Sequence, residues 1–216
     1  MKALVIGATG ATGKCLVDVL VDDPAYESVV LFVRRKSGIS HPKVTEVLTD
    51  FDRTGDIAEM IEGDVLFSCL GTTLKAAGST QQQYYVDYTI PVSFAGIAKR
   101  NGVDKIVLLS AYGASAGSRF FYSRVKGKLE DAIADLGFDQ YIIFRPGLLL
   151  RRNTDRAGER LSAWILHALN RFGIARRFRP LPAGLLAAKL AGSAKLLGSG
   201  VHIISLDEIF GFNNQS

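Results

Sequence analysis

Two stretches of this sequence contain residues that could do chemistry. The first is Gly7-Ala8-Thr9-Gly10-Ala11-Thr12-Gly13, which follows an apolar run and opens a helical pattern. Glycines at this spacing between a strand and a helix permit a tight turn and let a pyrophosphate approach backbone N–H groups. The run therefore predicts a dinucleotide site that is made by Gly7, Thr9, Gly10, Ala11, Thr12 and Gly13.

The second stretch is Tyr122-Ser123-Arg124-Val125-Lys126, which follows Ser110 at the end of another apolar run. Tyr and Lys four positions apart lie on one face of a helix. The Lys126 ammonium can then lower the pKa of the Tyr122 phenol from about 10 and reach the cofactor ribose. Ser110 is expected to orient a substrate carbonyl. Ser110, Tyr122 and Lys126 are the predicted catalytic residues.

The choice of cofactor is predicted from the end of the second expected strand. Enzymes that use NAD(H) place an acid there, about 20 residues beyond the glycines, to hold the ribose 2′-hydroxyl. This sequence has no Asp or Glu between residues 28 and 45, and Arg34 and Arg35 stand there instead. Two guanidinium groups suit a 2′-phosphate, so NADP(H) is favoured over NAD(H). Asp50 and Phe51 are expected to receive the adenine, although Asp50 could equally cap the next turn.

The positions of these residues require strands and helices that alternate along the chain. Short apolar runs rich in β-branched and aromatic residues predict strands, and the amphipathic patterns between them predict helices. Such alternation indicates an α/β fold, a doubly wound parallel sheet of the Rossmann type. The expected strands are 3–6, 29–33, 44–48, 65–69, 106–109 and 141–144, and the expected helices are 12–21, 55–61, 81–100 and 118–136.

After residue 144 the pattern changes. Within a single domain of residues 1–216, we expect a small helical lobe at 148–200 on the substrate side, with amphipathic stretches at 161–172 and 185–197. A last strand is expected at 201–206.

The segment from Arg151 to Pro182 holds eight arginines against two acids. This asymmetry is typical of a surface that meets an anionic substrate, a membrane surface or a protein partner, and equally of a solvated arginine-rich helix pair. Nucleic acid is not expected as a partner, because the arginines come without a docking motif or interleaved aromatic residues.

Composition limits the remaining possibilities. With 216 residues, 48% of them hydrophobic, and a net charge of +5, the chain fits one globular domain. No uncharged stretch approaches the roughly 18 residues that span a bilayer, so no transmembrane segment is expected. The N-terminus shows no secretory signal, and Cys15 and Cys69 are expected to be reduced thiols. These features together predict a cytoplasmic protein.

Other candidate sites are weaker. Gly113-Ala114-Ser115-Ala116-Gly117 matches the Gly-x-Ser-x-Gly turn of hydrolases, but that serine lies directly between strand and helix, whereas Ser115 lies five residues beyond Ser110. We interpret residues 113–117 as a flexible substrate loop. The three histidines have neither ligand spacing nor companions, so no metal site is proposed.

These motifs resemble those of the short-chain dehydrogenase/reductase superfamily over nearly the whole chain. Four segments look like its atypical Tat-interacting-protein-like NAD(P)H-binding branch: Cys69 to Thr73, Ser110-Ala111, Phe121 to Gly127 and Phe144 to Gly147. The resemblance implies a Rossmann fold, a bound dinucleotide and a site at Ser110, Tyr122 and Lys126. It also implies that the nicotinamide half of the cofactor lies along the backbone of Leu70, Gly71, Thr72 and Thr73 and along the turn of Pro146, Gly147 and Leu148. Cys69 is interpreted as a small residue that fits beside the cofactor.

The residues and the resemblance together predict an NADP(H)-dependent oxidoreductase that acts on a small carbonyl or alcohol. In this reaction Tyr122 exchanges the proton, Lys126 tunes Tyr122 and holds ribose, and Ser110 aligns the carbonyl. Many active members of the superfamily have Asn-Ala-Gly where this chain has Cys69-Leu70-Gly71, so a proton relay is not assumed. Two alternatives stay open: a non-catalytic NADPH sensor that binds a macromolecule, and an enzyme like the nucleotide-sugar epimerases or dehydratases.

Overall fold

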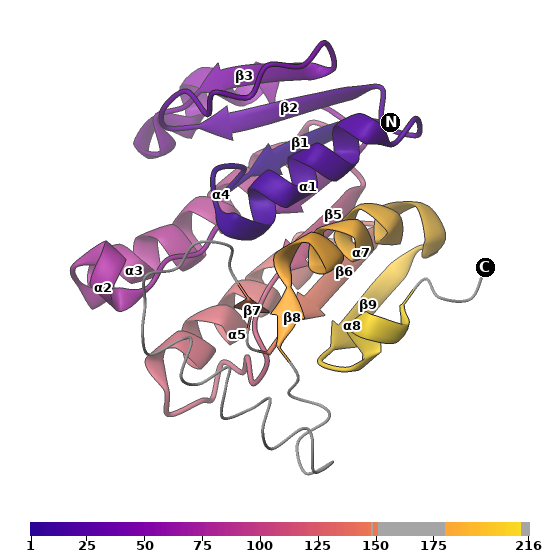
Figure 1. Ribbon diagram of the computed structural model, residues 1–216. Helices are drawn as coiled ribbons and strands as arrows, with labels where there is room; N and C mark the ends of the chain where they lie inside the picture. The colour runs from indigo at the N-terminus through magenta and orange to yellow at the C-terminus, as the bar shows by residue number, and fades with distance from the viewer. Residues whose placement is uncertain (148, 151–179, 213–216) are drawn as a thin grey trace.

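The computed structural model describes residues 1–147, 149–150 and 180–212 (Figure 1). Seven strands form one sheet in the order β3-β2-β1-β4-β5-β6-β9, and every neighbouring pair is parallel. The strands are β1 (Lys2–Ile6), β2 (Ser28–Val33), β3 (Val44–Leu48), β4 (Val65–Ser68), β5 (Lys105–Leu109), β6 (Gln140–Arg145) and β9 (Gly200–Ser205). The predicted Rossmann-type sheet is confirmed. Its strand order reverses between β1 and β4, where such sheets bind their ligands.

Helices cover both faces of the sheet (Figure 1). Alternate residues of β1 enter the two cores: Ala3 and Val5 pack on the side of α1 and α7, and Leu4 and Ile6 on the side of α4 and α5. Because both faces are covered, the central strands are apolar throughout instead of alternating with polar residues. The helix bounds are α1 (Ala11–Asp22), α4 (Ile90–Arg100), α5 (Phe121–Ala134) and α7 (Ala183–Leu196).

Shorter elements complete the described structure. A second, two-stranded sheet pairs β7 with β8 in parallel. Within the described ranges, no helix is long and apolar enough to cross a membrane. The short elements are the 3-10 helix η1 (Phe51–Met60), α2 (Leu74–Ala77), α3 (Thr80–Tyr84), the π-helix η2 (Tyr85–Thr89), β7 (Leu149–Leu150), β8 (Leu181–Pro182) and α8 (Glu208–Gly211).

The helix expected at 81–100 is divided into three pieces. An α-helical turn, α3, is followed by the π-helix η2 and then by α4. Pro91 lies in the first turn of α4. It has no N–H, and in a regular α-helix its ring would clash with the carbonyl group four residues earlier, which belongs to Asp87. A wider π turn at 85–89 relieves this conflict, and it sets the position of Asp87.

The helix expected at 185–197 is present as α7, but it lies elsewhere than predicted. It packs beside α1 over the sheet (Figure 1), and the Tyr26 hydroxyl donates a hydrogen bond to the Ala191 carbonyl at 2.6 Å. Residues 183–196 therefore belong to the helical layer of the sheet, not to a lobe beside it. The amphipathic stretch 161–172 and most of the Arg151 to Pro182 segment lie outside the described residues.

Candidate functional site

The glycine run forms a tight junction between β1, α1 and the turn after β4. Gly7 has a φ of +83°, and a Cβ there would lie 2.5 Å from the carbonyl carbon of Cys69. A Cβ on Gly13 would lie 2.1 Å from the Gly7 carbonyl oxygen. Both positions therefore require glycine. Since α1 begins at Ala11, the N–H groups of its first turn have no partner within the helix and are available to an anion.

Two adjoining cavities open at this junction. The larger, about 450 Å³, lies between the glycine run and the end of β2, and the second is about 240 Å³. Gly7, Thr9, Arg34 and Leu70 line both. The larger cavity is also lined by Ala8, Lys14, Phe32, Val33, Arg35, Lys36, Ser37 and Phe51. The second is also lined by Gly10, Cys69, Gly71, Thr72, Ala76, Ala77, Gln82 and Val86. Ten of the residues predicted to bind the cofactor are thus brought together in one cleft.

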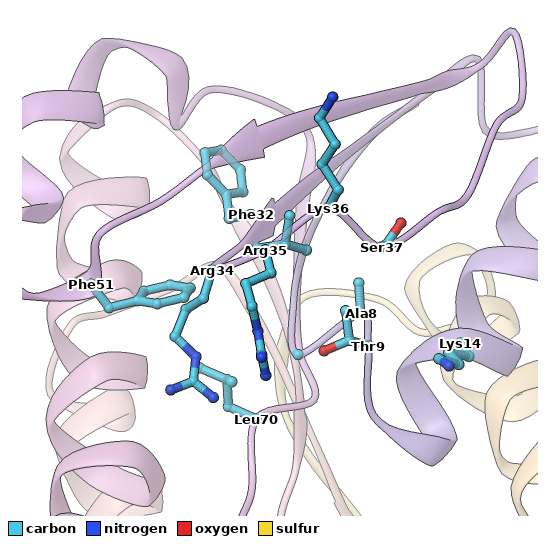
Figure 2. Close-up of a pocket in the computed structure, with 12 residues that line it drawn as sticks. Ala8, Thr9, Lys14, Phe32, Arg34, Arg35, Lys36, Ser37, Phe51 and Leu70 are labelled. Atoms are coloured by element: carbon cyan, nitrogen blue, oxygen red, sulfur yellow. The ribbon is translucent and has the colours of Figure 1, made fainter.

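Cationic side chains gather on the β2 side of the larger cavity. Figure 2 shows the Arg34 and Arg35 guanidinium groups pointing the same way into the cavity, whereas Lys36 extends in the opposite direction. Lys14 of α1 lines the same cavity. The loop is held in place because the Ser37 N–H donates a hydrogen bond to the Glu46 carboxylate at 3.0 Å. Lys14 is not among the predicted site residues, although it directly follows Gly13.

The two residues predicted to receive adenine are separated. Phe51 lines the larger cavity, whereas Asp50 lines a neighbouring cavity of about 430 Å³ that also includes Phe51 and Arg34. One oxygen of the Asp50 carboxylate accepts the Asp52 N–H at 3.0 Å and caps η1. Asp50 therefore performs the capping role that the sequence left open, and its contact with adenine stays a prediction.

The other predicted cofactor residues on α1 and after β6 that the structure describes do not line either cavity. Ala11, Thr12 and Gly13 form the first turn of α1, with Thr12 and Gly13 buried. Pro146 is buried after β6, and its carbonyl accepts the Tyr112 N–H at 2.9 Å, which joins the ends of β5 and β6. Gly147 follows and is exposed. Leu148 lies outside the described residues.

Tyr122 and Lys126 lie one turn apart on α5. The Lys126 side chain is buried, with its Nζ 6.0 Å from the centre of the Tyr122 ring. Lys126 Nζ donates a hydrogen bond to the Leu70 carbonyl at 3.3 Å, which ties α5 to the wall of both cavities. Tyr122 is 41% exposed. The pair thus places a buried cation beside the cleft beneath a phenol that solvent and substrate can reach.

The Ser110 hydroxyl is bonded to an acid of α5. Ser110 is buried, and its hydroxyl donates a hydrogen bond to the carboxylate of Glu130. That carboxylate also accepts hydrogen bonds from Arg145, at 3.1 Å from Nε and 2.5 Å from Nη2. Ser110 and Tyr122 share no hydrogen bond in the described structure. Orienting a carbonyl would require the Ser110 hydroxyl to leave Glu130, so its catalytic role stays a prediction.

Two buried acids of the site were missed by our sequence reasoning. Glu130 follows Lys126 by four residues on α5 and faces the interior. Asp87 is completely buried in η2, with Oδ1 at 3.4 Å from Lys126 Nζ. Burial raises the pKa of Asp87, while Lys126 and the Thr72 N–H act in the opposite direction. The available signal was the sequence spacing, because Asp87 precedes Ile90 by three residues and Phe94 by seven, which makes it an acid in an otherwise apolar helical stripe.

The other candidate nucleophiles are not poised to react. Burial raises the pKa of the Cys69 thiol to about 12, so it holds little thiolate at neutral pH. Ser115 lies well beyond the end of β5, in a loop packed so tightly on α5 that a Cβ on Gly127 would lie 2.1 Å from the Ser115 carbonyl carbon. This placement differs from a nucleophile turn between strand and helix.

Comparison with known proteins agrees with this fold and site. A sequence family described as NAD(P)H-binding matches residues 7–163. "Protein FMP52, mitochondrial" of Candida albicans is 37% identical over 163 residues, covering 73% of this chain and 71% of its own length. "Protein HTATIP2" of Rattus norvegicus is 35% identical over 168 residues, covering 76% of this chain and 68% of its own length.

Among solved structures, a short-chain dehydrogenase/reductase superfamily protein from Agrobacterium tumefaciens with bound NAD has a TM-score of 0.73 at 14% identity. The likeness covers 95% of this chain and 77% of the other, and at this identity it concerns the fold alone. The resemblance to the Tat-interacting-protein-like NAD(P)H-binding branch is confirmed by the family match and the HTATIP2 relative, and the fold agrees with it.

The expectation of a cytoplasmic protein is wrong. Relatives from Candida albicans, Meyerozyma guilliermondii, Eremothecium gossypii and Saccharomyces cerevisiae are all named as mitochondrial proteins. The number of cysteines and the lack of a recognisable secretory signal were insufficient grounds, because a reducing environment is not confined to one compartment.

The family match is not affected by this correction. With residues 7–163 matched and relatives above 30% identity, this chain belongs to the NAD(P)H-binding family.

Proposed function

We propose that this protein is an NADP(H)-dependent oxidoreductase that transfers hydride between the nicotinamide and a small carbonyl or alcohol. The observation that carries this proposal is the placement of Lys126. Its buried ammonium lies beneath the Tyr122 ring and donates a hydrogen bond to the Leu70 carbonyl on the wall of the cleft. One cation is therefore positioned to act on both the phenol and the ribose of a cofactor.

The preference for the phosphorylated cofactor rests on Arg34 and Arg35. Both guanidinium groups point into the larger cavity, at the end of β2, where the 2′ position of the adenosine ribose is held in this fold (Figure 2). Guanidinium groups form short, charge-assisted hydrogen bonds with a phosphate. The glycine run and the first turn of α1 would hold the pyrophosphate, and Phe51 would cover the adenine.

The chemical step is assigned to residues of this chain around a cofactor that supplies or accepts hydride. Tyr122 would hold the proton at its phenol oxygen and exchange it with the substrate oxygen. Lys126 would stabilise the phenolate electrostatically and hold the ribose hydroxyl groups. Pro146, Gly147 and Leu148 would border the nicotinamide. Ser110 would align the substrate oxygen only after its hydroxyl leaves Glu130.

The hydrogen bond from the Ser110 hydroxyl to Glu130 favours a second candidate function. In it, the protein binds NADPH as a signal and does not turn over a substrate. In that case NADPH would still occupy the cleft, but the Ser110 hydroxyl would stay bonded to Glu130 and would not activate a carbonyl. The two candidates differ in what Tyr122 does. Only an oxidoreductase needs its phenol proton.

Tyr122→Phe separates the two candidates. NADPH oxidation would be followed at 340 nm against a panel of small aldehydes, ketones and quinones, with NADPH affinity measured in parallel. For an oxidoreductase, turnover should fall by about 100-fold or more while the NADPH Kd changes little. Tyr112→Phe, which removes another exposed phenol near the end of β5, is the matched control and should keep most of the turnover. Tight NADPH binding without turnover of any substrate by the wild type would favour the sensor.

A further inference from the structure

The side chain of Phe120, at the start of α5, is unusually exposed for its size. It is 77% exposed, the highest value for a large apolar side chain among the described residues. Burial of a phenylalanine side chain stabilises a folded protein, and this side chain contributes little in that way. Tyr122, two residues later, is 41% exposed. An aromatic ring is therefore in contact with solvent close to the phenol that we assign to proton exchange.

Phe120 occupies the N-cap of α5, a position at which helices prefer Ser, Thr, Asp or Asn. Those side chains accept a hydrogen bond from an N–H group of the first turn, as Thr73 does for α2 and Ser79 for α3. The Phe120 side chain makes no such bond. The stability of α5 therefore does not explain a phenylalanine at its first position.

The backbone that bears Phe120 is held by three hydrogen bonds. Arg124 Nη1 donates to the Ser118 and Arg119 carbonyls at 2.7 and 3.1 Å. The Ser118 hydroxyl accepts the Phe120 N–H at 3.2 Å. An aromatic side chain on a backbone that is already fixed loses little conformational entropy when it contacts a ligand. Aromatic residues are for this reason frequent anchors of binding sites.

Phe120 lies at the end of the sheet where the cofactor cleft opens. In sheets of this type, ligands bind outside the carboxyl ends of the strands. The segments that follow β4 and β5 at that end carry four of the nine exposed large apolar side chains of the described residues, namely Leu74, Tyr112, Phe120 and Tyr122. Apolar side chains are therefore exposed around the end of the sheet that receives ligands.

We propose that the substrate of this site carries an apolar group, an alkyl chain or an aromatic ring, next to its carbonyl or alcohol, and that Phe120 binds that group. Contact with the ring would remove apolar surface of the substrate from water and add binding energy away from the reacting carbon. Arg124 is the positioning residue that holds the Phe120 backbone. The inference rests on the proposed function, because it takes Tyr122 as the residue that meets the substrate oxygen.

The test compares octanal with propanal, which has five methylene groups fewer. NADPH oxidation is followed at 340 nm, and kcat/KM is determined for each aldehyde. In the wild type, kcat/KM should be at least about tenfold higher for octanal, because each buried methylene group contributes about two- to fourfold. Phe120→Ser should lower this octanal-to-propanal ratio by about fivefold or more. A ratio near one in the wild type, or an unchanged ratio in Phe120→Ser, would overturn the proposal.

Phe120→Ser also separates substrate binding from folding. Serine is a preferred N-cap residue, so the variant should have the Tm of the wild type or a higher one. Phe120→Leu keeps an apolar side chain and should retain most of the octanal-to-propanal ratio. A Tm that falls together with the ratio in Phe120→Ser would assign Phe120 to packing and overturn the proposal.

Val201→Ser is the matched control. It also exchanges an exposed apolar side chain for serine, but Val201 lies beside Tyr141 near the amino end of its strand. Its octanal-to-propanal ratio should equal that of the wild type. If Val201→Ser lowered the ratio as much as Phe120→Ser does, the effect would be a general response to a less apolar surface, and the specific role of Phe120 would be overturned.

Binding of 1-octanol, measured by saturation-transfer NMR, separates this inference from the proposed function. If no aldehyde is reduced, the oxidoreductase is contradicted, and the 1-octanol affinity decides the role of Phe120. A loss of about fivefold or more in Phe120→Ser supports that role, whereas an unchanged affinity overturns it. If only sedimentation with phosphatidylglycerol vesicles were lost in Phe120→Ser, Phe120 would be a membrane anchor and the proposal would be overturned.

Discussion

The Ser110 hydroxyl donates its hydrogen to the Glu130 carboxylate, and that carboxylate is held in turn by two hydrogen bonds from Arg145. Ser110 follows β5, Glu130 belongs to α5, and Arg145 ends β6. The Tyr141 hydroxyl adds a fourth hydrogen bond, to the Glu130 backbone carbonyl at 3.1 Å. The cluster therefore fixes α5, which bears Tyr122 and Lys126, against the ends of two strands.

Ser110→Ala should affect stability more clearly than catalysis. Removal of the hydroxyl leaves a buried carboxylate with one hydrogen bond fewer, which costs about 1–2 kcal/mol. Turnover should fall by less than about tenfold, well below the loss expected for Tyr122→Phe. Thermal unfolding and NADPH oxidation measure the two effects. A 100-fold loss of turnover with an unchanged Tm would instead show that the Ser110 hydroxyl leaves Glu130 during turnover and aligns the substrate oxygen.

Replacement of Arg34 and Arg35 by alanine should change cofactor preference. Loss of the charge-assisted hydrogen bonds to a 2′-phosphate should weaken NADPH by about 10- to 100-fold, and NADH by less than about threefold. Fluorescence titrations with both nucleotides measure this.

Lys36→Ala is the control for the arginine variant, because it removes a neighbouring cation whose side chain points away from both guanidinium groups (Figure 2). It should weaken NADPH much less than the double variant does. Equal losses for NADPH and NADH in Arg34→Ala/Arg35→Ala would remove the argument for a 2′-phosphate.

Gly13→Ala should disrupt the junction of β1 and α1. The new Cβ would meet the Gly7 carbonyl oxygen at 2.1 Å and Ala8 Cα at 2.9 Å, so the helix must shift. Overpacking of this kind costs at least about 2 kcal/mol, which is a fall in Tm of about 4–8 °C for a chain of this size.

Gly184→Ala is the control for the glycine variant. Gly184 lies in the first turn of α7, and a Cβ there meets nothing within 4 Å. Its Tm should be unchanged or slightly higher, because alanine favours the helix. Equal Tm values for Gly13→Ala and the wild type would contradict the tight junction that the structure places there.

Cys69 should resist alkylation in the folded protein. Burial raises the pKa of its thiol to about 12, so the thiolate that reacts with iodoacetamide is scarce at pH 8. In a Cys15→Ser background, labelling at pH 8 should be at least about 100-fold slower than in urea. Labelling of the folded protein should accelerate as the pH rises toward the pKa of the Cys69 thiol. Rapid labelling of the folded protein at pH 8 would revive a reactive role for Cys69.

The sheet could be predicted closely from the sequence, because its strands are short apolar runs buried on both faces. All seven expected strands, including 201–206, agree with the structure to within one residue at each end. The helices were harder. The helix expected at 81–100 did not include the π turn η2. That turn arises from a clash between the Pro91 ring and the carbonyl four residues earlier, which a hydrophobic pattern does not reveal. The position of α7 beside α1 depends on tertiary packing, which an amphipathic pattern does not reveal.

Some residues of the candidate site could be predicted from the sequence, and others could not. The glycine run and Arg34 with Arg35 are local features of single turns, and the structure brings them into one cleft. The partners of Ser110 and Lys126 are distant in sequence. Glu130 lies 20 residues beyond Ser110, and Asp87 comes from a different helix than Lys126. Pairings of this kind are set by the packing of helices on the sheet, so no motif in the sequence indicated them.

The most direct test of this account is a fluorescence titration of the purified wild-type protein with NADPH and with NADH. We expect saturable binding of both at the same site, with NADPH bound at least about tenfold more tightly because of Arg34 and Arg35. Equal affinities would contradict the assignment of NADP(H). Absence of binding by either nucleotide would contradict the oxidoreductase and the sensor together.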